Sequence, residues 1–142
     1  MKNLNFLTSR YEINKDAGLL VIRVVIGLSL MVFHGYSKIK GGPEVWTEVG
    51  NDIGVLGIKF FPVFWGFMAG FAEFFCSFFL ILGVLFRPAT ILLSFTMLVA
   101  VIVHLNLPPE SPAAGWSGAS HALELLAVYV GLFFTGPGKY KL

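Results

Sequence analysis

Seven ionisable side chains lie within or at the ends of long apolar stretches of this 142-residue chain. They are Arg23, His34, Lys38, Glu73, His104, His121 and Glu124. Charged groups inside a bilayer cost a few kcal/mol each, so they normally face the interior of a helix bundle and find partners there. Glu and His side chains can also exchange protons with a bound molecule. We therefore predict that these seven residues bind a ligand, with Glu73 and Glu124 as the candidate catalytic groups.

Helical spacing places several of these residues on common faces. Arg23, His34 and Lys38 are separated by eleven and four residues, so they share one face of a helix. His121 and Glu124 are three residues apart and share a face of another helix. With His104 at the end of a third apolar stretch, this pattern predicts a polar pocket that opens just beneath the outer membrane surface.

Several kinds of site fit such a pocket. A quinone or quinol headgroup could exchange hydrogen bonds and protons with the His and Glu side chains. A metal such as zinc or iron could use the four side chains of His34, His104, His121 and Glu124. The sequence has no H-x-x-x-H pair, however, and we predict no metal site. A haem could lie between His34 and His104, or the histidines could simply be interfacial side chains that reach water.

Arg23 and Glu73 are the deepest of these residues. A helix rises about 1.5 Å per residue, and on that scale an extended Arg side chain could cover much of the difference in depth between them. We expect Arg23 either to form a structural ion pair with Glu73 or to tune its proton exchange. The single cysteine, Cys76, and the lack of a C-x-x-C motif exclude a self-contained thiol–disulfide enzyme.

The composition identifies the elements that position these groups. The chain is 56% hydrophobic and 13% charged, whereas about a quarter of the residues of a soluble domain are charged. A helix needs roughly 20 apolar residues to cross a bilayer, and four stretches are suitable: about 17–36, 60–85, 88–105 and 119–135. The predicted fold is an all-α membrane protein, a four-helix transmembrane bundle with up-down topology that forms one domain over residues 1–142.

Two local patterns add detail to this bundle. After the first span, Val45, Trp46, Val49 and Ile53 recur at helical spacing, and Pro43 suits a helix start. This pattern predicts an interfacial amphipathic helix between helices 1 and 2. Gly66 and Gly70 form a small-x-x-x-small motif, which lets helices approach closely and which we expect to pack within the bundle.

Taken together, the motifs resemble a known family. The first helix ends in HGYSKIKGG, the second contains FAEFFCSFFLILGVLFRPAT, the third ends in MLVAVIVHL, and the chain closes with ELLAVYVGLFFTGPGKYKL. This pattern is similar to the DoxX family of four-helix bacterial membrane proteins, over nearly the whole chain. The family ending after Gly-Pro-Gly usually continues into a Ser-Leu-Asp-like stretch, whereas this chain stops at KYKL.

The resemblance implies a place in the bacterial inner membrane and a link to redox chemistry. Namesake members are the small membrane subunit of a thiosulfate:quinone oxidoreductase, others associate with oxidative-stress proteins, and distant relatives act as receptors or assembly chaperones. We expect a subunit that handles a quinone for a partner oxidoreductase, without an intrinsic cofactor. A small-solute or proton transporter and a non-catalytic assembly factor are the alternatives. We also expect contact with lipid, a possible homodimer and no nucleic-acid partner.

The distribution of basic residues predicts the orientation in the membrane. Six Lys and Arg residues lie on the side of the two termini, and three lie on the other side. Because cytoplasmic segments carry the excess of basic residues, both termini should be cytoplasmic. The polar leader lacks a small-residue cleavage site, so we expect no cleaved signal peptide.

Reporter fusions test this topology. A reporter enzyme that works only in the cytoplasm should be active when fused at Leu142, and one that works only in the periplasm should be active in the 106–118 loop. An active periplasmic reporter at Leu142 would refute this topology.

Overall fold

A computed structural model describes residues 14–142, and these residues form an all-α structure. Residues 1–13 lie outside the described residues, and they include Lys2 and Arg10, two of the six basic residues counted on the side of the termini. The first half contains α2 (Lys15–Leu30), the π-helical turn η1 (Met31–Gly35), α3 (Tyr36–Asn51) and the 3-10 turn η2 (Asp52–Leu56). The second half contains α4 (Pro62–Phe71), the π-helical turn η3 (Ala72–Cys76), α5 (Ser77–Leu82), α6 (Phe86–Asn106) and α7 (Gly115–Thr135).

Within residues 14–142, four helical segments are long and apolar enough to cross a membrane. They are Lys15–Leu56, Pro62–Leu82, Phe86–Asn106 and Gly115–Thr135. The predicted all-α membrane bundle is therefore confirmed, and the helix ends lie within a few residues of those predicted except at the first helix. That helix continues past position 36 into the segment predicted to be a separate interfacial helix.

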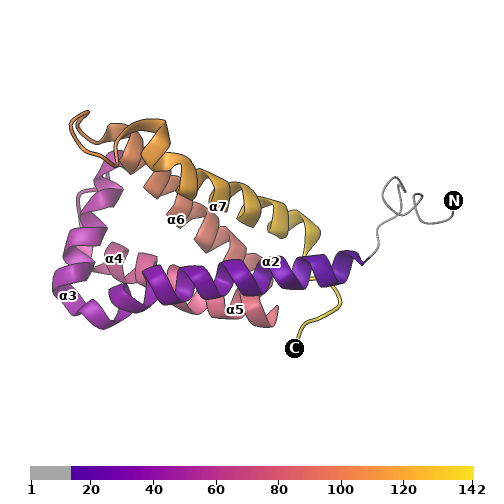
Figure 1. Cartoon of the computed structure of the whole chain (residues 1–142). Coiled ribbons are helices and arrows are strands. Elements are labelled where there is room, and N and C mark those ends of the chain that lie inside the picture. Colours follow the sequence, from indigo (N-terminus) through magenta and orange to yellow (C-terminus); the bar gives the residue numbers. More distant parts are fainter. Residues whose placement is uncertain (1–13) are drawn as a thin grey trace, which may run out of the picture.

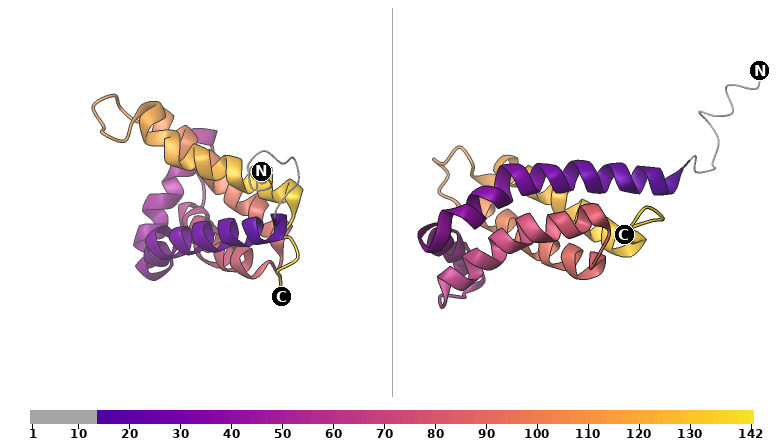
Figure 2. Two further views of the ribbon diagram at one scale, coloured as in Figure 1. Left: turned by 45° about the vertical axis from the view of Figure 1, so that its right-hand side comes forward. Right: turned by 90° about the horizontal axis from the view of Figure 1, so that it is seen from below.

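The helices form two groups that diverge towards one end (Figure 1). The helix α2 lies alongside α5, and α6 packs along α7 as an antiparallel pair. The two groups are close together near the C-terminal tail and further apart at the opposite end, where α3 extends from one group towards the other (Figures 1 and 2). The bundle therefore has a narrow end at the C-terminal tail and a wide end at α3.

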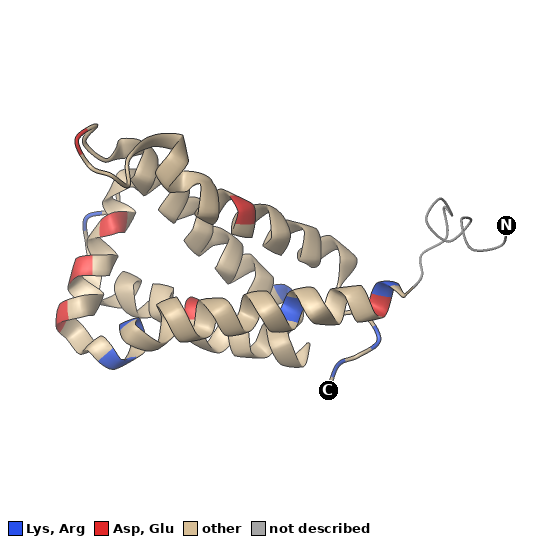
Figure 3. Cartoon of the chain, in the orientation of Figure 1, with Lys and Arg blue, Asp and Glu red and all other residues tan. Residues whose placement is uncertain are grey.

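The charged residues are concentrated at these two ends (Figure 3). Both acidic and basic residues lie along α3 at the wide end, and further basic residues lie at the start of α2 and in the C-terminal tail. The long helices between them carry few charges, as expected for segments that lie in hydrocarbon.

A kink at Gly42 divides α3 into two segments. Gly42 has φ 72° and ψ −166°, a conformation that favours glycine, and Pro43 follows it at the start of a new helical segment. The indole N–H of Trp46 then donates a hydrogen bond of 2.7 Å to the carbonyl oxygen of Lys38, which ties the second segment back to the first. The predicted amphipathic helix is thus present, as the part of α3 that follows this kink.

The segment after the kink packs tightly against α4. A Cβ atom at Gly66 would lie 1.8 Å from the carbonyl oxygen of Trp46, and a Cβ atom at Gly70 would lie 3.2 Å from the Cβ of Lys38. Only glycine at position 66 permits this approach of two backbones. The prediction that the Gly66–Gly70 motif packs within the bundle is confirmed.

The narrow end is held by the guanidinium group of Arg23, which is 1% exposed. Its Nε donates to the carbonyl oxygen of Leu80 at 2.9 Å, and its Nη2 donates to that of Ile81 at 2.6 Å. Its Nη1 donates to the carbonyl oxygens of Tyr140, at 2.9 Å, and Pro137. Arg23 therefore joins α2 to the C-terminal end of α5 and to the tail of the chain.

This arrangement shows that the expected ion pair between Arg23 and Glu73 is wrong. The last carbonyl groups of a helix have no partner within the helix and carry a partial negative charge. At the end of α5 these carbonyl groups lie within reach of Arg23, and they offer a forked donor several acceptors at once. The guanidinium group consequently points to the narrow end, while Glu73 finds another cation.

We predict that Arg23→Gln destabilises the protein strongly, because it leaves several buried carbonyl groups without a donor. The loss should be about 3 kcal/mol or more in the free energy of unfolding. Thermal unfolding in detergent would measure it, and trypsin should cut faster at Lys139 and Lys141 as the tail is released. Arg87→Gln is the control, since Arg87 is exposed. A variant at position 23 that melts with the wild type would contradict this role.

Candidate functional site

A cavity of about 540 Å³ is lined by residues from both groups of helices, towards the wide end. Its volume is within the range of small-molecule binding sites. Its walls are mostly apolar and include the aromatic side chains of Phe64, Trp65 and Phe95. Five of the seven predicted site residues line it, namely His34, Lys38, Glu73, His104 and His121. The structure thus brings together residues from η1, α3, η3, α6 and α7.

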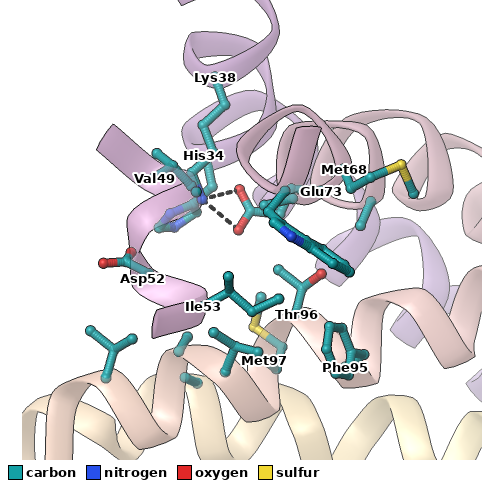
Figure 4. Close-up of a pocket in the computed structure, with 18 of the residues that line it drawn as sticks. His34, Lys38, Val49, Asp52, Ile53, Met68, Glu73, Phe95, Thr96 and Met97 are labelled. Carbon is teal, nitrogen blue, oxygen red and sulfur yellow. Dashed lines mark hydrogen bonds and ion pairs between the residues drawn. The ribbon is translucent and has the colours of Figure 1, made fainter. Parts of the chain in front are cut away.

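The polar centre of the cavity is an ion pair between Lys38 and Glu73 (Figure 4). The Lys38 Nζ lies 2.6 Å from each carboxylate oxygen of Glu73. The Glu73 side chain is 5% exposed and that of Lys38 is 24% exposed. A buried carboxylate needs such a partner to remain charged, and Lys38 supplies it from the cavity wall.

Two π-helical turns position this pair. The turn η1 carries His34 and ends at Gly35, and the turn η3 carries Glu73. A Cβ atom at Gly35 would lie 2.6 Å from the carbonyl carbon of Glu73 and from the amide nitrogen of Phe74, so only glycine allows the two turns to touch. Single π-helical turns occur often at functional sites, because they change the direction in which nearby side chains point.

The histidines contribute in two different ways. The Nδ1 of His104 lies 2.8 Å from the carbonyl oxygen of Ala113, so this nitrogen carries the proton and donates. In the neutral ring, Nε2 is then free to accept a hydrogen bond from a molecule in the cavity. The rings of His34 and His121 stack, with 6.0 Å between their centroids, and connect η1 with α7.

Arg23 and Glu124 are not among the residues that line the cavity. Arg23 lies at the narrow end, and Glu124 is exposed on the surface of α7. The positions of α7 that line the cavity are Gly118, His121, Ala122 and Leu125. His121 lies at the edge of the face of α7 that lines the cavity. Glu124, three residues further along, lies beyond that edge and therefore does not face the cavity.

Asp52 also lines the cavity, and sequence reasoning missed it (Figure 4). It lies in η2 and follows Glu44 and Glu48 at helical spacing, a pattern typical of the polar face of an amphipathic helix. Thr96 and Met68 line the cavity as well, from α6 and α4. Their inward direction became visible only once the packing of α3 against α4 and α6 was known.

The histidines and acidic residues are not arranged as a metal site. In the part of the chain that the structure describes, no three His, Cys, Asp or Glu side chains are grouped so that they could hold a metal ion. His34 and His121 stack on each other, and the Nδ1 of His104 is used by Ala113. The four-ligand arrangement considered from the sequence is therefore not formed.

The sequence model of the DoxX family matches residues 18–106, well over half of the chain. The chain belongs to the DoxX family. DoxX proteins are membrane proteins that are often linked to redox or stress functions. The match covers α2 to α6, with Lys38, Glu73 and His104 of the cavity, and ends before α7. No curated protein and no solved structure matches this DoxX chain.

The unequal exposure of the two partners in the ion pair leads to a prediction. Lys38→Met should lower the free energy of unfolding by about 3 kcal/mol, because it leaves the Glu73 carboxylate buried without a cation. Glu73→Gln should cost less, since the partly exposed Lys38 side chain can reach water. The double variant should regain part of the loss, as measured by unfolding in detergent.

Arg23 and Glu73 serve as the control pair for the double-mutant cycle of Lys38 and Glu73. The two side chains have separate partners, so the effects of Arg23→Gln and Glu73→Gln should add. Additive losses for Lys38 and Glu73, or strong coupling between Arg23 and Glu73, would contradict the arrangement described above.

Proposed function

We propose that this DoxX protein binds a quinone-like lipophilic molecule in its cavity, as the membrane subunit of a quinone-linked redox complex. The observation that carries the proposal is the Lys38–Glu73 ion pair in the wall of an otherwise largely apolar cavity. A quinone has the same combination of features, since it pairs an apolar ring and tail with two polar oxygens.

The walls of the cavity suit a flat ring that arrives from the bilayer. Trp65, Phe64 and Phe95 provide aromatic surface from α4 and α6. Phe64 is 53% exposed and Phe95 is 41% exposed, so the cavity wall reaches the surface between these two helices. In a membrane this surface faces lipid, which is where a hydrophobic quinone dissolves. In this proposal the ligand enters between these two helices directly from the lipid.

The polar groups can interact with both redox states of the ligand. The ammonium group of Lys38 can donate to a quinone carbonyl oxygen. The carboxylate of Glu73 and the Nε2 of His104 can accept from a quinol hydroxyl. Conversion of quinone to quinol takes up two electrons and two protons. In this proposal Glu73 and His104 exchange the protons, and a partner oxidoreductase exchanges the electrons.

The proposed setting is the bacterial inner membrane, with both termini in the cytoplasm. The cavity then lies in the outer half of the bilayer, and the Arg23 network lies on the cytoplasmic side. Protons released from a quinol in this cavity would reach the outer side more easily than the cytoplasm. That direction is useful to a respiratory chain, and it supports a quinone-linked subunit.

Two measurements test the proposal. Mass spectrometry of a lipid extract of the purified protein should detect co-purified quinone. Short-chain benzoquinone or naphthoquinone analogues should raise the melting temperature, because a ligand that binds only the folded form stabilises it. Ala100→Phe should abolish this rise, since it fills the cavity without removing a polar group. Ala127→Phe, at an exposed position of α7, is the matched control and should keep it.

A second pair of variants tests the polar groups. Glu73→Gln should reduce the rise in melting temperature, and Glu124→Gln should leave it unchanged because Glu124 does not line the cavity. A wild-type protein that neither carries quinone nor shows a shift with any analogue would overturn the proposal. The assembly-factor alternative would then be the better account of the chain.

A further inference from the structure

Two hydroxyl groups in the core have no hydrogen-bond partner among the described residues. They are the side-chain oxygens of Ser77 and Tyr129, and both residues are 0% exposed. A buried hydroxyl group without a partner costs about 1–3 kcal/mol, so native proteins nearly always satisfy it with protein atoms or with ordered water. The hydroxyl groups of Ser77 and Tyr129 should therefore have a hydrogen-bond partner.

Ser77 and Tyr129 each lie one helical turn beyond a residue that lines the cavity. On α7, Leu125 lines the cavity and Tyr129 is one turn deeper. On the other side, Glu73 lines the cavity and Ser77 is one turn deeper, at the start of α5. Helical side chains lean towards the N-terminal end of their helix. The helices α7 and α4–α5 both begin at the wide end, so side chains at these two positions lean towards that end, where the cavity lies.

The Glu73 carboxylate can accept more hydrogen bonds than Lys38 donates. This carboxylate lines the cavity one turn above Ser77, on the cavity side of the two hydroxyl groups. Lys38 contacts both carboxylate oxygens of Glu73, but an ionised carboxylate has about four acceptor positions. Acceptor positions that Lys38 does not occupy remain for a donor on the side of the bundle core.

We propose that Tyr129 and Ser77 bind ordered water beneath the cavity, and that this water donates a hydrogen bond to the Glu73 carboxylate. A water molecule can accept from the Tyr129 hydroxyl, exchange a hydrogen bond with Ser77 and donate to Glu73, which gives it three polar partners. Buried waters typically make about three such bonds. The water site gives Glu73 a second hydrogen-bonding neighbour, opposite Lys38, whether or not a quinone binds.

Tyr129→Phe provides the decisive test, because a hydroxyl group with a water partner and one without a partner predict different changes in the melting temperature. If the hydroxyl bonds to water that reaches Glu73, its removal should lower the melting temperature in detergent without any ligand. If the hydroxyl has no partner, replacing it by hydrogen should leave the melting temperature unchanged or raise it. Tyr36→Phe, at an exposed tyrosine, is the matched control and should have little effect.

A double-mutant cycle tests the connection to Glu73. The effect of Tyr129→Phe should be smaller in a Glu73→Gln background, because the neutral amide is a weaker acceptor. Ser77→Ala should behave like Tyr129→Phe, with Ser29→Ala as its exposed control. Additive effects, or a Tyr129→Phe protein that is as stable as the wild type or more stable, would overturn the proposal.

Radiolytic footprinting of the wild-type protein provides a measurement that needs no variant. Hydroxyl radicals formed from bound water modify the side chains beside that water. Tyr129 should therefore be labelled despite its complete burial, whereas the buried aromatic ring of Phe86, at 6% exposure, should be protected. Protection of both rings would show that no water lies beside Tyr129 and would also overturn the proposal.

Discussion

The guanidinium group of Arg23 is the interaction on which the narrow end of the bundle depends. A full positive charge at 1% exposure is stable only with several acceptors around it, and this one uses carbonyl oxygens instead of a carboxylate. Those carbonyl groups belong to the end of α5 and to the tail, and the Phe86 ring, centred 5.7 Å from the Arg23 Cζ, covers the group. The tail is held further by Asp16, which accepts from the Lys139 N–H at 2.9 Å. Because this end is tied together, the helices diverge only at the other end, where the cavity forms.

Much of the fold was predictable because it follows from composition and spacing. Four apolar stretches of bilayer length predict four spanning helices, and the Gly66–Gly70 motif predicts a close contact within the bundle. The continuity of the first helix with α3 was not predictable. Gly42 and Pro43 predicted a break, but the structure absorbs them as a kink inside one long helical segment. A kink and an interruption have the same sequence signal, and the packing of α3 against α4 decides between them.

The candidate site was predictable in its residue types but not in its pairing. His34, Lys38, Glu73, His104 and His121 could be selected because polar groups in apolar helices face inward. The partner of Glu73 could not be selected, because Arg23 and Lys38 lie on one face of the first helix. By sequence alone, Glu73 on the second helix could reach either of them. The competing acceptors for Arg23 are backbone carbonyl groups at a helix end, which carry no residue signature. The two π-helical turns also shift the facing of His34 and Glu73, and no pattern of side-chain types reveals them.

The contact between Gly35 and the Glu73 backbone has a consequence for how such a cavity can change over evolutionary time. Any side chain at position 35 would push apart the turns that hold the ion pair, so we expect glycine to be retained there. The aromatic and aliphatic walls from α4 and α6 face no such restriction, because they contribute shape and not backbone contact. A lineage can therefore exchange wall residues, and with them the ligand that fits, while the charged centre keeps its geometry. Variation among relatives is therefore expected in the wall residues and not at Gly35.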